Sequence, residues 1–456
     1  MTRVLVVCGD PVGPVMAGPG IRSLEMARAL ARSGASVTLA APGAVEVTAE
    51  APGAPAVSTV STDDPRALRR ALAAAEAVVA GGMTLAQLPL LARSDLPVAV
   101  DLYGPYVLEN LAAVAAAGPA ASERARRHAS DLAVLNLHAR RGDFFVCASE
   151  VQRDFWLGLL VALGRVNPAT HGHDPTLRRL LDVVPFGLPA TPPRAPGRPV
   201  LRGVVPGFGP HHEIVLWGGG LWDWLDPSTL VEAAGLLVAR RPALRVLFLA
   251  GSPPGGSVGP MAAGAGARAR ARELGLLDRV VFFREAWLPY GDRAGYLLEA
   301  DVGCSLHLPH VETRYAFRTR LLDCFWARLP VVVSGGDVLS ELVARHDLGR
   351  VVPCRDAAAV AGALAELLDA PGGRAAMAPR FDGPIAALTW SAAVRPLAAY
   401  LERPWRAADR PSVVADVADT PLRRLPGRAV AVLAERGPFG LVAEARRYVR
   451  WRRRPR

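Results

Sequence analysis

The sequence contains no lysine, so all 53 of its basic side chains are arginine. This absence excludes a Walker A phosphate loop, because that loop needs a lysine to contact the β- and γ-phosphates. It also lacks a G-x-S-x-G nucleophile elbow, which disfavours a serine hydrolase. Any phosphate group that this chain binds must therefore be held by arginine, by backbone amides or by a helix N-terminus.

Cysteine is scarce, and long apolar runs are missing. The five cysteines are widely spaced and form no C-x-x-C pair, which predicts free thiols in a reducing cytoplasm. No apolar run approaches the roughly 18 to 20 residues of a membrane span. The short apolar run at residues 4–8 is more typical of a buried strand than of a signal peptide. We therefore expect a cytoplasmic protein that does not cross a bilayer.

The 456 residues are 51% hydrophobic, which suffices for two full cores. The formal net charge is +11, but its distribution is uneven. Residues 405–456 hold thirteen arginines against five acidic residues and thus contribute eight of the eleven charges. The remainder is only mildly basic, which disfavours a nucleic-acid partner.

Strand and helix patterns alternate through the first part of the chain. An apolar run at 4–8, a Gly/Pro loop at 9–20, a helical stretch at 22–32 and a second run at 36–40 predict a β-α-β unit. Three further buried runs follow, at 75–81, 96–103 and 143–149. Residues 1–183 are therefore expected to form a doubly wound, Rossmann-like α/β domain that binds ligands at the carboxyl ends of its strands.

Residues 184–212 are dense in proline and glycine and predict a linker. The alternation restarts at 214–220 and continues to 330–336, which predicts a second Rossmann-like domain over residues 213–378. Two such domains around a central cleft are typical of enzymes that bind a nucleotide or a phosphorylated substrate.

The loop after the first strand is a candidate anion site. Gly18 and Gly20 allow backbone amides to approach an anion, and the following helix N-terminus favours negative charge by about 0.3 to 1 kcal/mol. Arg22 opposes the dipole of that helix, which a bound anion would explain. A tight turn that needs glycine only for its geometry is the alternative.

A second cluster of charges lies in residues 307–337. Guanidinium groups of Arg318 and Arg320 suit a pyrophosphate, and the carboxylate of Asp323 suits the two ribose hydroxyls of a nucleotide. Glu312 belongs to the same segment. The alternative is an exposed helix start held by salt bridges.

The end of this segment, ARLPVVVS at 327–334, resembles the donor-binding motif of the retaining family 4 glycosyltransferases. In that motif two acidic residues precede a small-small-Leu-Pro-Val-Val ending, and Asp323 falls at the second, ribose-binding position. The first position falls on Tyr315, so Glu312 takes that role, contacting the donor sugar, only if the loop is longer. Further segments over about residues 1–400 resemble an actinobacterial-type branch, namely 148–158, 184–189, 217–233 and 297–307.

This resemblance implies a GT-B fold and a hexosyl transfer with retention that needs no metal or other cofactor. The C-terminal domain would bind the nucleotide-sugar donor, the N-terminal domain the acceptor, and a helix within 379–404 would cross back to the N-terminal domain. The family's Arg and Lys after the first strand of the second domain are missing here. We therefore assign the departing diphosphate to Arg318 and Arg320, with the backbone amides of Gly219 and Gly220.

The acceptor-side candidates are Asp101, at a strand end, and His138, in LNLHARRGD. A surface cap is the alternative for Asp101, and helix packing is the alternative for His138. The spacing of His307, His310 and Glu312 resembles a zinc site, but no third ligand pattern supports it. We expect no metal.

The basic tail, 405–456, ends in a stretch whose spacing places apolar and arginine side chains on opposite helix faces. Such a tail suits an anionic membrane surface, at roughly 1 kcal/mol per basic side chain. A solvated tail is the alternative. The acceptor would then be a lipid-linked or cell-envelope glycan, and otherwise another glycan or a small molecule. Two competing functions are a non-catalytic GT-B scaffold or membrane-associated binding protein, and a sugar-nucleotide epimerase or phosphorylase.

Overall fold

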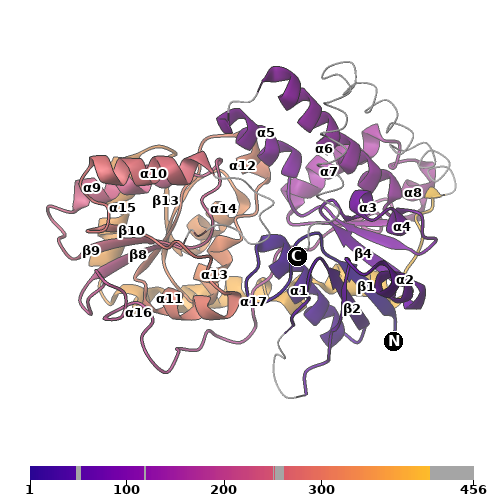
Figure 1. The fold of residues 1–456 in the computed structure, drawn as a ribbon, viewed down its shortest axis with the longest axis horizontal. Helices are drawn as coiled ribbons and strands as arrows, with labels where there is room; N and C mark the ends of the chain where they lie inside the picture. The colour runs from indigo at the N-terminus through magenta and orange to yellow at the C-terminus, as the bar shows by residue number, and fades with distance from the viewer. Residues whose placement is uncertain (48–52, 118–119, 250, 252–260, 411–456) are drawn as a thin grey trace.

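The structure is a computed structural model that describes residues 1–47, 53–117, 120–249, 251 and 261–410. Two α/β domains lie side by side, each built on a parallel sheet with helices on both faces (Figure 1). The predicted two-domain α/β fold is thus confirmed. Most of the basic tail, 411–456, lies outside the described residues.

The first sheet has seven parallel strands in the order β3-β2-β1-β4-β5-β6-β7. Its central strands are mostly buried and apolar, with Arg3 at the start of β1 and Asp101 at the end of β5 as charged ends, as expected when helices cover both faces of a sheet. The strands are β1 Arg3–Val7, β2 Ser36–Ala41, β3 Ser58–Ser61, β4 Ala77–Gly81, β5 Val98–Asp101, β6 Phe144–Cys147 and β7 Leu181–Val183. The helices are α1 Gly18–Arg32, α2 Pro65–Ala74, α3 Thr84–Gln87, α4 Pro89–Ala92, α5 Tyr106–Ala117, α6 Ala121–Arg141, α7 Glu150–Ala162 and α8 Pro168–His173.

The second sheet has six parallel strands in the order β10-β9-β8-β11-β12-β13. They are β8 Glu213–Trp217, β9 Leu244–Phe248, β10 Val281–Phe283, β11 Val302–Ser305, β12 Val331–Ser334 and β13 Gly349–Val352. The helices are α9 Pro227–Leu237, α10 Ala262–Glu273, α11 Arg293–Glu299, α12 Val311–Tyr315, α13 Arg320–Trp326, α14 Val338–His346, α15 Ala357–Asp369 and α16 Gly373–Met377, with short 3₁₀ turns at Tyr290–Asp292 and Ala378–Phe381.

Each sheet reverses its strand order at one point, between β1 and β4 in the first domain and between β8 and β11 in the second. Ligands of open α/β sheets bind outside the carboxyl ends of the strands at such a point. The switch points therefore predict a ligand site beside the loops after β1 and β4 in the first domain and after β8 and β11 in the second.

The first helix begins at Gly18, four residues earlier than the sequence predicts. Pro19 fits there, because proline has no amide hydrogen to satisfy in a first helical turn. Gly18 and Gly20 thus belong to the helix and not to the preceding loop. Arg22 is consequently the fifth residue of the helix and not part of its N-terminal turn.

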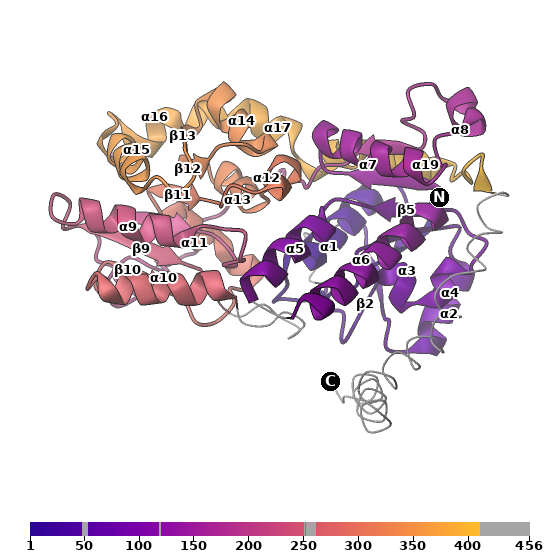
Figure 2. The ribbon, with the colours of Figure 1, turned by 90° about the horizontal axis from the view of Figure 1, so that it is seen from above.

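After the second domain the chain returns to the first through α17 Asp382–Ala387, α18 Trp390–Ala393 and α19 Arg395–Glu402 (Figure 2). The ring of Tyr400 on α19 stacks on Phe144 of β6, with centroids 4.7 Å apart. The returning segment also touches the outgoing one, since the amide of Leu188 donates to the carbonyl of Leu388 and the amide of Trp390 donates to the carbonyl of Leu188, at 2.9 and 3.0 Å.

The chain is then fastened to the first domain by buried ion pairs. Arg165 Nε lies 2.7 Å from Asp409 Oδ2, and Arg410 Nη1 lies 2.9 Å from Asp143 Oδ2. Within the described ranges, no helix is both long and apolar enough to span a membrane.

Candidate active site

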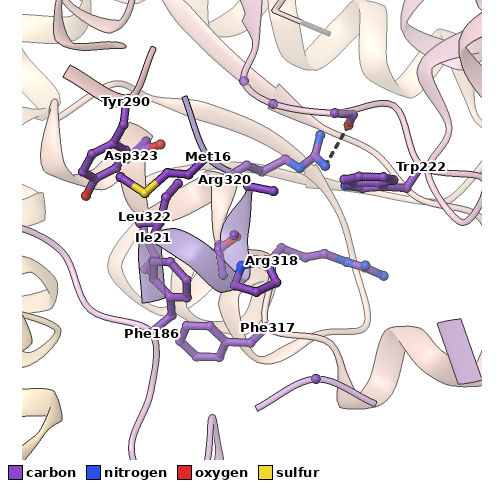
Figure 3. Close-up of a pocket in the computed structure, with 18 of the residues that line it drawn as sticks. Met16, Ile21, Phe186, Trp222, Tyr290, Phe317, Arg318, Arg320, Leu322 and Asp323 are labelled. Carbon is purple, nitrogen blue, oxygen red and sulfur yellow. Dashed lines mark hydrogen bonds between the residues drawn. The ribbon is translucent and has the colours of Figure 1, made fainter. Parts of the chain in front are cut away.

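A cavity of about 430 Å³ opens between the two domains, at the carboxyl ends of their strands. The first domain contributes residues that follow β1 and β5, and the second contributes residues that follow β8 and β11. Figure 3 shows side chains from both domains converging on this space, with an apolar side that contains Met16, Ile21, Phe186, Phe317 and Leu322 and a side with the guanidinium groups of Arg318 and Arg320.

Arg318 and Glu312 form a two-point ion pair in the wall of the cavity. Arg318 Nη1 lies 3.0 Å from Glu312 Oε1, and Nη2 lies 2.7 Å from Oε2. Both side chains are buried, with 7% of the Arg318 side chain and none of Glu312 exposed. The Nε of Arg318 is buried without a hydrogen-bond partner among the described residues.

Arg320 begins α13 and reaches across to the loop after β8. Its Nη2 donates to the carbonyl of Gly220 at 3.0 Å, and its guanidinium lies 5.3 Å from the ring centroid of Trp217. Its Nη1 is buried and has no hydrogen-bond partner in the described part of the chain. Burial, aided by the neighbouring charge of Arg318, lowers the pKa of Arg320 to about 9, so the group stays cationic at neutral pH. A negatively charged ligand would satisfy it.

The loop after β8 contains glycine and tryptophan at the place where family 4 glycosyltransferases usually have Arg and Lys. Gly219 has a positive φ of 88°, a conformation that glycine adopts without strain. The rings of Trp222 and Trp224 stack with centroids 5.8 Å apart, and Trp222 packs over Gly220. Gly219, Gly220 and both tryptophans line the cavity.

The two aspartates of this loop have structural roles. Asp223 Oδ1 accepts a hydrogen bond from the amide of Ala263 at 3.0 Å, in the first turn of α10. Asp226 caps α9 by accepting from the amide of Thr229. Such caps satisfy amides that the helix leaves free.

Asp323 lines the cavity and pairs with Arg293, whose Nε lies 2.9 Å from Asp323 Oδ1. The guanidinium of Arg293 is held between aromatic rings, 3.6 Å from the Tyr290 centroid and 4.6 Å from that of Trp326. The sequence offered no motif that would have indicated Arg293. The pair leaves 40% of the Asp323 side chain exposed.

Arg22 and Asp101 pair with each other and do not line the cavity. Arg22 Nε lies 2.6 Å from Asp101 Oδ2, and its Nη2 lies 2.9 Å from Oδ1 and 2.8 Å from the carbonyl of Val184. The position of Arg22 in the second turn of α1 directs its side chain toward β5. Gly18 does line the cavity, whereas Gly20 is needed for packing, since a Cβ there would lie 2.6 Å from the carbonyl oxygen of Pro11.

His138 also lies away from the cavity, buried on α6. Its Nδ1 lies 2.8 Å from the carbonyl of Val134, and its Nε2 accepts from the amide of Leu85 at 3.3 Å. Burial lowers the pKa of His138 to about 4, so the ring is neutral at pH 7. In this structure the ring serves helix packing.

The sequence reasoning missed two carboxyl groups on the N-terminal side, Asp10 and Glu109. Burial raises the pKa of Asp10. Burial, together with the nearby Glu312 and against the effect of Arg318, raises the pKa of Glu109 to about 7. Their positions after β1 and β5, at the carboxyl edge of the sheet, are the signal by which they could have been found.

The residues with zinc-like spacing are engaged elsewhere. His307 Nε2 lies 3.1 Å from the carbonyl of Gly335, and the Nδ1 of His310 accepts from the amide of Glu312 at 3.2 Å. Among the residues that the structure describes, no group of three or more His, Cys, Asp or Glu side chains is arranged to hold a metal ion.

No protein-family model and no curated protein matches the sequence. Solved structures do match over nearly the whole described fold. Sucrose-phosphate synthase from Thermosynechococcus elongatus aligns with a TM-score of 0.60 at 17% identity, covering 88% of this chain and 99% of that one. Anabaena HepE, solved with UDP and glucose, aligns at 0.60 and 12% identity, covering 88% and 100%.

A third structure is WaaG, a glycosyltransferase involved in lipopolysaccharide biosynthesis, with a TM-score of 0.54 at 15% identity, covering 89% and 98%. At such identities the likeness establishes the fold. The chain therefore has the GT-B fold, and its cavity lies in the cleft between the two domains.

Proposed function

We propose that the protein is a glycosyltransferase that moves a hexosyl group from a nucleotide sugar to a hydroxyl group of an acceptor, with retention and without a metal. The observation that carries this proposal is the pair of arginines, Arg318 and Arg320, each with a buried N–H group that lacks a partner among the described residues and both lining the interdomain cavity. A departing nucleoside diphosphate supplies the oxygen acceptors that these groups need. One structural neighbour, HepE, is described in complex with UDP-glucose.

The charges of the cavity support Arg320 as the main contributor to catalysis. Arg318 is paired with Glu312, and Arg293 is paired with Asp323, so their charges are largely balanced. Arg320 donates only to a carbonyl among the described residues. When the bond between the sugar and the diphosphate breaks, negative charge develops on the leaving oxygen, and a well-placed cation stabilises it by a factor of about 10² or more in rate.

The remaining donor contacts follow from the same geometry. The amides of Gly219 and Gly220 adjoin Arg320, so they are placed to contact the same diphosphate. Asp323 lines the cavity with 40% of its side chain exposed, which suits a ribose hydroxyl. Glu312 lines the cavity but has both oxygens on Arg318 and none of its side chain exposed, so its contribution is to hold Arg318 beside the donor.

For the acceptor side, we infer action on a glycan, lipid-linked or small-molecule acceptor in the cytoplasm, with the basic tail favouring the anionic membrane surface. The support is the concentration of eight of eleven net charges in residues 405–456. Binding of the full chain to vesicles with and without anionic lipid tests this step, and equal binding to both would contradict it.

The first experiment measures donor binding and slow hydrolysis. Thermal stability and released nucleotide are followed with UDP-, GDP-, dTDP- and ADP-glucose for the wild type and for Arg320→Ala. Arg314→Ala is the matched control, because Arg314 is exposed on the adjacent helix α12 and does not line the cavity. Stabilisation by one donor that Arg320→Ala loses and Arg314→Ala keeps would support the proposal.

Other outcomes of this experiment favour the competing functions. No response to any donor would favour the scaffold or binding protein. Turnover of the donor sugar without an acceptor, or only with free phosphate, would favour an epimerase or a phosphorylase. The anomeric configuration of a transfer product, measured by NMR, tests retention.

A further inference from the structure

Glu109 stands in the first turn of α5 and enters the cavity from the N-terminal domain. It lines the same cavity as Glu312 and Arg318 of the second domain. The helices that carry the two sides, α5 and α12, pack against each other. Glu109 thus brings a carboxyl group of the first domain to the cavity that Arg318 and Arg320 of the second domain also line.

The approach of α5 to α12 is fixed by a buried bridge. The side chain of Gln152 is fully buried, and its Nε2 donates to the carbonyl of Tyr103 at 2.8 Å and to that of Tyr315 at 2.7 Å. Its Oε1 accepts from the amide of Ala148 at 2.8 Å. Gln152 therefore hydrogen-bonds both the loop before α5 and the end of α12. These buried contacts fix the position of the helix that carries Glu109.

The chemistry at this point calls for a hydrogen-bond donor from a ligand. Glu109 is partly buried, and its carboxyl group makes no hydrogen bond or ion pair with any residue that the structure describes. Asp10 brings a second carboxyl group to the same wall, and the hydroxyl of Tyr103 lies within the electrostatic reach of both. Carboxylates accept hydrogen bonds from hydroxyl groups and repel phosphates, so this wall suits the hydroxyl-bearing substrate and not the diphosphate.

We propose that Glu109 binds the acceptor: its carboxylate accepts a hydrogen bond from the attacking hydroxyl group and takes the proton as the oxygen bonds to the sugar carbon, while the bond from that carbon to the diphosphate breaks and the diphosphate leaves as the anion. This inference rests on the proposed transferase function and deepens it, because it places the acceptor hydroxyl between α5 and the Arg318–Glu312 pair. In the absence of an acceptor, a water molecule occupies the same position during slow hydrolysis of the donor.

The test separates acceptor activation from donor binding. Glu109→Gln keeps the shape of the side chain and removes the charge, and Glu123→Gln is the matched control on the exposed face of α6. The affinity for each nucleoside diphosphate is measured by calorimetry, and hydrolysis of the corresponding glucose donor is measured in water and with glycerol as a hydroxyl acceptor. A hydrogen bond to a charged group predicts a rate lower by about 10- to 100-fold in Glu109→Gln. The affinity of Glu109→Gln for the nucleoside diphosphate should stay within about twofold of the wild-type value, because the proposed diphosphate site lies in the other domain.

Three results would overturn the inference. The first is a wild-type rate in Glu109→Gln, and the second is an equal loss of nucleotide affinity and rate, which would assign Glu109 to the donor. The third is donor binding by the wild type without turnover in water or glycerol. If the wild type binds none of UDP, GDP, dTDP and ADP, the proposed function itself fails and this inference fails with it. A folded Glu109→Gln that behaves as Glu123→Gln in thermal stability at pH 5 excludes a folding defect.

Discussion

Arg318 and Glu312 meet through two parallel N–H···O contacts of 3.0 and 2.7 Å in a wall that solvent hardly reaches. They are only six positions apart, yet α12 ends and the chain turns between them, so the pair fixes the shape of the segment between α12 and α13. A preformed pair of this kind holds the unpartnered Nε of Arg318 in place before any ligand arrives. The pair therefore fixes the Arg318 guanidinium in this wall of the cavity.

Breaking this pair should lower the free energy of unfolding. Glu312→Ala leaves the Arg318 charge buried without a carboxylate, which predicts a loss of about 3 to 5 kcal/mol in the free energy of unfolding. Replacing both residues, as in Glu312→Leu with Arg318→Met, should recover most of it. Urea titration monitored by tryptophan fluorescence measures both. An equal loss in the single and double variants would contradict this explanation.

Arg320 should matter for turnover and little for stability. Arg320→Ala removes a buried cation that has no carboxylate partner in the described structure, so the melting temperature should not fall by more than a few degrees. Donor hydrolysis should fall on the order of 10²-fold. Rates and melting curves of Arg320→Ala are compared with those of Arg314→Ala. A variant that melts far below the wild type would instead assign Arg320 a structural role.

The raised pKa of Glu109 predicts a pH dependence of stability. Its pKa rises from 4.5 in the unfolded chain to about 7 in the fold, where Glu312, Arg318 and Tyr103 are the charged and titratable groups that act with it. The folded state therefore binds the proton more tightly, and this contribution to stability is present below pH 4.5 and is lost as the pH rises through 7. The melting temperature of Glu109→Gln should equal that of the wild type near pH 5 and exceed it at pH 8. A constant difference across this range would contradict the prediction.

The pair of Arg22 and Asp101 predicts a structural defect and not a binding defect. Asp101→Asn removes the charge that balances Arg22, of which only 1% is exposed, and should lower the free energy of unfolding by about 3 to 5 kcal/mol. Calorimetry at a temperature where the variant is folded should give the wild-type nucleotide affinity. Loss of nucleotide affinity in the folded variant would contradict this prediction and would indicate that Arg22 and Asp101 belong to the ligand site.

The fold follows from sequence patterns because the buried parallel strands are continuous apolar runs, as in residues 4–8, which contain most of β1. The Pro/Gly-rich break at 184–212 carries no named helix or strand. Such signals are local, so a single sequence contains them. The predicted GT-B fold is confirmed by the two sheets and by the likeness to solved GT-B structures.

The site was only partly predictable. Glu312, Arg318, Arg320 and Asp323 line the cavity, because strand ends of an α/β sheet converge on one edge. The sequence placed the start of the first helix four residues too late, so Arg22 was predicted to lie in its first turn. Its pairing with Asp101 spans 79 positions in the sequence, and no local pattern reveals such a contact. Glu109 was missed for a related reason, since its importance depends on a contact between α5 and α12 that only the fold creates.

The two chain segments that pass between the domains are hydrogen-bonded to each other where Leu188 meets Leu388 and Trp390. The two domains are thus joined by two hydrogen-bonded chain segments. An opening of the cleft that keeps these bonds must rotate one domain about an axis that runs through both segments. Twisting or sliding of one domain on the other would shear these bonds, whereas rotation about the axis leaves them intact. A protease nick in either crossing alone would leave the two halves attached through the other crossing.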